Sequence, residues 1–159
     1  MKIEMGESLI YSWLRHEKLC QLVQTNWKVS PFWELENRQE IEDLFVICRN
    51  YFLEKHSLDI SKGCSLEQFL KQAEIDGIGI AYSTEAPYIY AVDVAYHEGG
   101  LNYGGKDETI TKIAQKCIRT ALCLYGYFCM STGEVLFVSP QITPAIETAL
   151  VPLFDEISK

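Results

Sequence analysis

Asp93 is the residue whose type and surroundings most strongly indicate chemistry. It interrupts the segment Tyr88–Tyr96 (YIYAVDVAY), which is otherwise apolar or aromatic and typical of a β-strand. Burying an unpaired carboxylate in a covered strand is costly, unless it binds a metal, pairs with a base or lies at the rim of the sheet. We therefore expect Asp93 to be functional, with an N-cap or a salt bridge to a helix lysine as the ordinary alternative.

A second aspartate, Asp76, opens another predicted strand, Gly77–Tyr82 (GIGIAY). The five residues 83–87 between the two strands are typical of a hairpin turn. An antiparallel hairpin brings Asp76 and Asp93 towards the same end of the sheet. Two carboxylates that meet there offer the oxygen ligands preferred by a hard divalent ion such as Mg²⁺, or Mn²⁺ in its place.

This arrangement resembles the core of the PD-(D/E)XK nucleases, the restriction-endonuclease-like phosphodiesterases. In that family an aspartate opens one strand, the second strand of a hairpin carries an acidic residue, and a helix and a further strand follow. The likeness covers roughly residues 73–140 and implies a magnesium-dependent hydrolase, with Asp76 and Asp93 as metal ligands and catalytic residues. The N-terminal half also resembles bacterial proteins of undetermined function, a likeness that implies no chemistry.

The sequence departs from the family pattern at one important position. The family lysine falls two residues after the second acidic residue, where this chain has Ala95. Some members carry the basic residue on the following helix, where Lys112, Lys116 and Arg119 share one face at spacings of four and three. The resemblance thus implies a catalytic role for Lys112 and Lys116, against the ordinary alternative of a solvated helix face. Some members also draw a glutamate from the first helix, which would make Glu7 a third metal ligand.

A non-catalytic domain on the same scaffold is the second hypothesis, because the motif lysine is missing. It would bind another protein, or a second copy of itself through the tyrosine-rich strand to form a homodimer. The formal net charge of −8 and the pI near 4.9 favour this hypothesis. An acidic surface repels nucleic acid unless its basic residues are gathered at one place.

A nucleotide-binding protein is a minor alternative. The loop Gly100–Lys106 (GLNYGGK) fits the phosphate-loop pattern GxxxxGK between a strand and a helix. The next position should be Ser or Thr, and it is Asp107, followed by Glu108. Two carboxylates there compete with phosphate for the helix N-terminus. We expect the glycines instead to let the loop pass close to the sheet edge.

The elements that must position these residues predict an α/β (α+β) domain. We expect a single mixed sheet with a central antiparallel hairpin flanked by helices, as in the restriction-endonuclease-like core. The whole chain, residues 1–159, forms one domain in this interpretation, with a helical N-terminal part (1–72) and a sheet-containing core (73–159). Beyond the hairpin we expect helices over 4–24, 38–55, a short segment capped by Ser65, 108–127 capped by Asp107, and 143–157, with a further strand over 134–139.

The first predicted helix has an apolar stripe at spacings of three and four that includes Met5, Leu9 and His16, so His16 is expected in the core. Between the first two helices, Trp27 and Trp33 lie in a segment expected to be extended. These tryptophans indicate either a stacking platform for bases or, more simply, a loop anchored on the core.

Composition sets the wider frame. With 159 residues, 48% of them apolar and 23% charged, the chain matches one ordinary globular domain. It lacks an apolar run of about 18 residues, so no membrane span is expected. Glutamates near the N-terminus argue against a signal peptide. Six scattered cysteines without a CxxC pair indicate reduced, partly buried thiols. We expect a cytoplasmic protein without a membrane partner.

Overall fold

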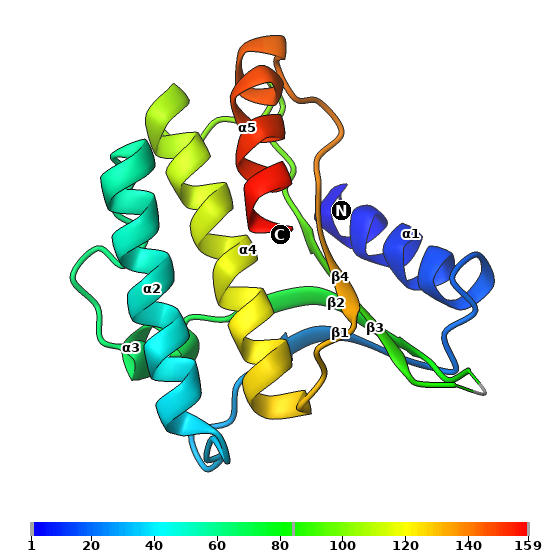
Figure 1. The fold of residues 1–159 in the computed structure, drawn as a ribbon. Coiled ribbons are helices and arrows are strands. Elements are labelled where there is room, and N and C mark those ends of the chain that lie inside the picture. The colour runs from blue at the N-terminus through cyan, green and yellow to red at the C-terminus, as the bar shows by residue number, and fades with distance from the viewer. Residues whose placement is uncertain (1, 84, 159) are drawn as a thin grey trace.

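The computed structural model describes residues 2–83 and 85–158 of the chain, which form one four-stranded sheet with five helices around it (Figure 1). The predicted class is confirmed: the sheet is mixed, and its order is β1-β2-β3-β4. The elements are α1 (Lys2–His16), β1 (Leu22–Lys28), α2 (Arg38–His56), α3 (Leu66–Lys71), β2 (Glu74–Ala81), β3 (Tyr88–Val94), α4 (Lys106–Phe128), β4 (Gly133–Val138) and α5 (Pro144–Ile157).

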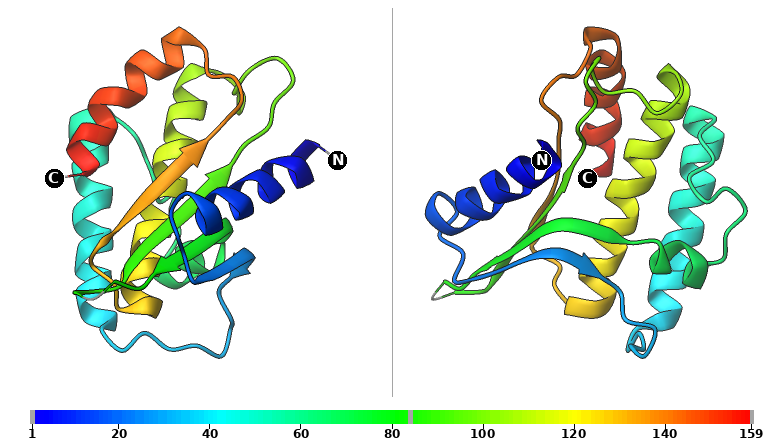
Figure 2. Two further views of the ribbon diagram at one scale, coloured as in Figure 1. Left: turned by 90° about the vertical axis from the view of Figure 1, so that its right-hand side faces the viewer. Right: turned by 180° about the vertical axis from the view of Figure 1, so that it is seen from behind.

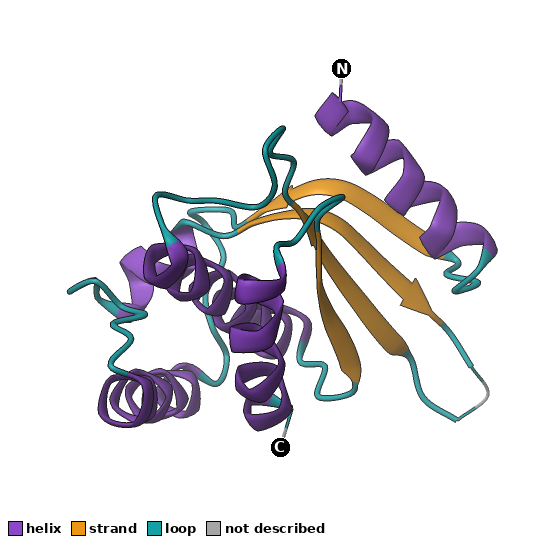
Figure 3. Ribbon diagram, turned by 90° about the horizontal axis from the view of Figure 1, so that it is seen from above, coloured by secondary structure: helices purple, strands orange, loops and turns teal. Residues whose placement is uncertain are grey.

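The sheet is covered on both faces. Helix α1 crosses one face, while α2, α4 and α5 lie on the other (Figures 2 and 3). Val92 on β3 packs towards α1 in a small core, whereas Ile89 and Ala91 belong to the larger core that contains α4. Alternate residues of β3 therefore face opposite layers, as the period of a strand requires. No helix in the described part of the chain is long and apolar enough to cross a membrane.

The predicted hairpin is confirmed. Strands β2 and β3 pair antiparallel from Gly77↔Val92 to Ala81↔Tyr88. From β3 the chain crosses through α4 and returns as β4, parallel to β3, with Asp93 opposite Phe137. A parallel neighbour needs such a crossover, and its helix must pack on a face of the sheet. The connection therefore fixes α4 over the end of β3 that carries Asp93.

The N-terminal helix is shorter than predicted. It ends at His16, and residues Leu22–Lys28 form strand β1, which pairs antiparallel with β2. The spacing of Cys20 and Val23 continues the helical stripe by coincidence, while Leu19 at φ 55° breaks the helix. The segment 1–72 is consequently not all helical, because the sheet already begins at residue 22.

The packing face of α1 also differs from the predicted stripe. Met5 and Leu9 are 68% and 69% exposed, and His16 is exposed too, whereas Ile10 and Leu14 are buried against the sheet. The strand below supplies the reason. Gly79 has no side chain, so α1 and the turn that follows it approach the backbone closely.

Helix α4 starts two residues earlier than predicted. Gly105 stands at its N-cap and Asp107 lies inside the first turn, so the predicted cap at Asp107 is wrong. Gly104 and Gly105 have φ of 118° and 136°, a conformation that glycine adopts readily, and this lets the chain turn into the helix at Lys106. The cap predicted at Ser65 is confirmed, since Ser65 forms a capping box with Gln68.

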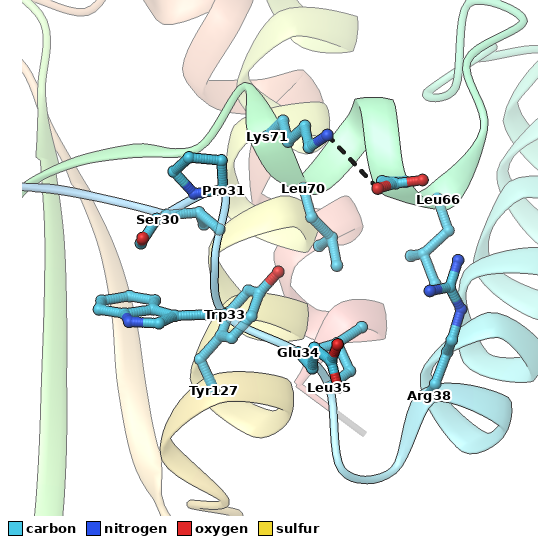
Figure 4. A pocket seen from close by; sticks show the side chains of 12 residues that line it. Ser30, Pro31, Trp33, Glu34, Leu35, Arg38, Leu66, Leu70, Lys71 and Tyr127 are labelled. Atoms are coloured by element: carbon cyan, nitrogen blue, oxygen red, sulfur yellow. Dashed lines mark ion pairs between the residues drawn. The ribbon is translucent and has the colours of Figure 1, made fainter.

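The two tryptophans pack as a loop anchor. Trp27 is buried, with its ring centroid 5.8 Å from that of Trp33 and 5.5 Å from that of Phe128. Figure 4 shows the pocket of about 210 Å³ beside Trp33 and Tyr127. The ion pair of Lys71 with Glu67, at 3.3 Å, lies at its edge. The ring contacts of Trp27 with Phe128 and of Trp33 with Tyr127 tie β1 and the loop after it to α4.

The close approach of α1 to the sheet generates a stability test. A Cβ added at Gly79 lies 2.7 Å from Cys20 Sγ and 3.0 Å from Leu14 Cδ2, so Gly79→Ala forces the helix off the strand. We expect a loss of about 1–3 kcal/mol in the free energy of unfolding, measured by urea denaturation. The control is Gly99→Ala, where the added Cβ meets nothing within 4 Å. Equal stability of the two variants would contradict this packing.

Candidate functional site

Asp76 and Asp93 lie at the same end of the hairpin and line one pocket. The antiparallel register ends at the pair Gly77↔Val92, and the two aspartates are the next residues of β2 and β3 beyond that pair. On the other side of β2 the register pairs Thr25 with Gly77 and Trp27 with Ile75, which places Asn26 beside Asp76. Asn26 is not itself paired with Asp76, and its φ of 53° departs from strand geometry. The charge of Asp76 raises the pKa of Asp93, so the two carboxylates repel each other.

Asp93 is almost completely withdrawn from water, with its side chain 2% exposed. Thr120 Oγ1 donates a hydrogen bond of 3.2 Å to Asp93 Oδ2, and Lys116 Nζ lies 3.9 Å from Asp93 Oδ1. The pKa of Asp93 is raised to about 6, mainly by burial, which Lys116 opposes and the charge of Asp76 reinforces. One loose ion pair therefore leaves this carboxylate short of positive charge.

Asp76 is half-buried and occupies the place of a ladder carbonyl. Its Oδ2 accepts a hydrogen bond of 2.6 Å from the backbone N–H of Val94. Burial raises the pKa of Asp76 most, the Val94 hydrogen bond and Lys116 lower it, and Glu7 and Glu74 raise it. The net direction is upward, so both members of the pair would gain from a nearby cation.

Helix α4 supplies the basic side of the site. Lys112, Lys116 and Arg119 line the same pocket as the two aspartates. Burial lowers the pKa of Lys112, and the neighbouring charges of Lys62, Arg119 and Lys116 lower it further. These three basic side chains are thus gathered in one pocket, although the chain as a whole carries a net charge of −8.

Glu7 reaches the pocket from α1 but is held by a different partner. Its Oε2 accepts a 3.4 Å hydrogen bond from Asn26 Nδ2. Across residues 2–83 and 85–158, no three His, Cys, Asp or Glu side chains are placed to share one metal ion. The structure therefore offers the pair of aspartates, rather than three carboxylates, as ligands in this arrangement.

All five site residues predicted from the sequence line a single cavity of about 430 Å³. They are Glu7, Asp76, Asp93, Lys112 and Lys116. Sequence reasoning missed four polar neighbours that also line it, Asn26, Gln72, Glu74 and Thr120. Thr120 follows Lys116 by four residues, so the helical period could have found it. Asn26 and Gln72 carry no such signal, because their places depend on the pairing of β1 and the turn before β2.

The ligand chemistry of the pair suits magnesium. Mg²⁺ commonly uses one or two carboxylates together with water and substrate phosphate, so a third protein ligand is not required. Asp76 and Asp93 are hard oxygen donors whose raised pKa values reflect burial that nearby positive charge offsets only in part. Asp76 and Asp93 are the residues that would hold the ion.

The backbone N–H groups of the Gly-rich loop donate hydrogen bonds to side chains of the loop and of α4. Asn102 Oδ1 accepts hydrogen bonds of 2.9 Å from the N–H groups of both Gly104 and Gly105. The N–H of Tyr103 donates to Thr109 Oγ1 at 2.9 Å. A phosphate loop instead directs such N–H groups at the ligand. These contacts disfavour the nucleotide-binding alternative.

No protein-family model, curated protein or solved structure matches the chain. The chemistry of the pocket between the hairpin and α4 is therefore what indicates a function.

The burial of Asp93 makes stability depend on pH. Its folded pKa of about 6 exceeds the ordinary value of 3.8, so the native state holds this proton more tightly than the unfolded chain. The stabilisation by the protonated form is complete below about pH 4 and is lost as pH rises through 6, at a total of about 3 kcal/mol. We expect Asp93→Asn, which cannot ionise, to remove this loss. Urea denaturation from pH 4 to pH 8 without metal measures the free energy of unfolding of each protein.

The exposed Asp155 provides the matched control. Asp155→Asn should follow the pH profile of the wild type, whereas Asp93→Asn should gain stability relative to it above pH 6. Parallel profiles for all three proteins would show that Asp93 is not a buried acid of raised pKa.

Proposed function

We propose that this protein is a divalent-metal-dependent phosphodiesterase, a nuclease-like hydrolase in which Asp76 and Asp93 hold the metal. One observation carries the proposal: two carboxylates at the same end of the hairpin share a pocket with the cationic face of α4. A purely structural pair of acids would be expected to close onto tight salt bridges. Here the one ion pair to Asp93 spans 3.9 Å, and the cavity remains open.

The residues of the pocket divide the work of phosphodiester hydrolysis. A Mg²⁺ or Mn²⁺ ion bound by Asp76 and Asp93 supplies a Lewis acid for a phosphoryl oxygen and lowers the pKa of the attacking water. The water oxygen would form a bond to phosphorus while a phosphorus–oxygen ester bond breaks, and the proton of the water would pass to bulk solvent. Negative charge would grow on the phosphoryl and leaving oxygens. Lys112 and Lys116 line the same cavity and offset that charge.

The charge distribution supports a phosphodiester substrate. An acidic protein is a poor general binder of polyanions, but the field inside a cleft depends on the groups that line it. Lys28 forms an exposed ion pair with Glu74 at 3.0 Å, and the three α4 cations line the pocket together with Glu7, Glu74 and the two aspartates. Nucleic acid is thus the proposed partner at this pocket, while the rest of the surface repels it.

A non-catalytic binding domain is the second candidate, and a different surface favours it. Ala95 is buried where the nuclease motif has its lysine. A groove of about 800 Å³ between α1 and the end of β3 is lined by exposed or half-exposed apolar groups, including Met5, Leu9 and Pro140. Such a surface fits another protein or a second copy of this chain. Sedimentation of wild type and Leu9→Glu, with a dimer only in the former, would support it.

The metal-site proposal predicts how variants behave in a cleavage assay. Supercoiled plasmid, single-stranded DNA and RNA are each incubated with the protein and Mn²⁺ or Mg²⁺, with EDTA as the blank. We expect Asp76→Asn and Asp93→Asn to lower the cleavage rate at least about 100-fold, because each removes a metal ligand. Lys116→Gln should lower it roughly 10- to 100-fold by removing charge stabilisation.

Asp155→Asn is the control, with the fold of every variant checked by circular dichroism. The proposal fails if purified wild type cleaves none of the three substrates with either metal. It also fails if Asp93→Asn cleaves at the wild-type rate.

A further inference from the structure

Among the described residues, Arg119 is a buried cation without an ion pair, although the charge of Asp93 acts on it. Its side chain is 6% exposed on the face of α4 that lines the pocket. The guanidinium carbon lies 4.6 Å above the ring of Phe69, and Nη2 donates a 3.1 Å hydrogen bond to Gln72 Oε1. Nε is buried without a hydrogen-bond partner. Throughout the described part of the chain, no carboxylate lies within 4.0 Å of this guanidinium.

This arrangement is costly for a structural arginine. Arginine stays charged in proteins, and buried guanidinium groups are ordinarily paired with carboxylates. A neutral amide and an aromatic ring replace only part of the hydration that is lost. The same loss of hydration lowers the pKa of Arg119. The buried guanidinium therefore keeps a hydrogen-bond donor at Nε that no group in the described part of the chain uses.

Lys112 lies seven residues before Arg119 on the same face of α4 and is less buried. It lines the pocket, and no carboxylate of the described chain lies within ion-pair distance of it. The other nearby lysines are engaged: Lys62 pairs with Glu108 at 2.7 Å, and Lys116 faces Asp93. Lys112 and Arg119 are therefore the two pocket cations left for a ligand.

We propose that Arg119 and Lys112 form an anion subsite that binds a phosphoryl group. Guanidinium presents its N–H groups in a planar fork that suits phosphate oxygens, and the ammonium of lysine adds a mobile point charge. The identification of that group as part of a phosphodiester substrate rests on the proposed function. The subsite itself needs neither metal nor catalysis.

The test uses the metal-free protein and inorganic phosphate. Wild type is titrated with phosphate in EDTA at constant ionic strength, and binding is followed by calorimetry and by backbone amide shifts in NMR spectra. Arg119→Met keeps the length of the side chain but removes its charge, and Lys112→Met is a second variant at a less buried position. We expect each to raise the phosphate dissociation constant at least tenfold.

Lys71→Met is the matched control, because it removes one lysine charge from the neighbouring α3 outside this pocket. It should change the dissociation constant less than twofold. A second readout separates ligand binding from a structural role. Arg119→Met should melt at the wild-type temperature or above it, since it removes an unpaired buried charge. A clear fall in melting temperature would assign Arg119 to structure and overturn the proposal.

The outcomes also separate this subsite from the nuclease proposal. Phosphate binding that depends on Arg119 and Lys112, in a protein that cleaves nothing, keeps the subsite and removes the nuclease. Cleavage that depends on Asp93, in a protein whose phosphate affinity is unchanged in both cation variants, keeps the nuclease and removes the subsite. Wild type that binds no phosphate overturns the subsite directly.

Discussion

The burial of Asp93 near Asp76 is the constraint to which the rest of the site responds. The two carboxylates line one pocket at the same end of the hairpin, and Asp93 is removed from water. Desolvation is the larger cost, and the charge of Asp76 adds to it. The surrounding structure meets it in part with the N–H of Val94, the hydroxyl of Thr120 and the distant ammonium of Lys116.

The topology explains why the compensating groups come from α4. Because β4 is parallel to β3, the connection between them must cross the sheet, and α4 is that crossover. Its cationic face therefore lies over the end of β3 that carries Asp93. On the opposite face α1 packs tightly on glycine and brings Glu7 to the same pocket. Anionic and cationic groups are thus held together without closing into tight pairs.

The partial separation of charge gives the site its chemical character. The aspartates form an anionic side suited to a divalent cation, and Lys112 with Arg119 forms a cationic side suited to phosphate. Each side is only partly neutralised within the protein, and the metal-bound phosphoryl ligand that we propose would supply the charge that both sides lack. The net charge of −8 is compatible with this because it describes the whole surface, whereas a ligand in the cleft meets only its lining.

How much the sequence could predict depended on the kind of signal. Asp93 in an apolar strand and the spacing of Lys112 and Lys116 are local signals, and both correctly indicated residues that meet in one pocket. Strand β1 was missed because Cys20 and Val23 happen to continue a helical spacing. Tertiary contacts decided the remainder. The packing face of α1 depends on Gly79, a residue some seventy positions away whose effect no local pattern records.

The most direct test of the central claim is a crystal structure of the protein grown or soaked with Mn²⁺, with anomalous scattering used to locate the metal. We expect an anomalous peak from a Mn²⁺ ion bound by carboxylate oxygens of both Asp76 and Asp93. We expect this peak to be absent in crystals of Asp93→Asn. Well-ordered density for both side chains with no peak between them, or with Lys116 closed tightly onto Asp93, would contradict it.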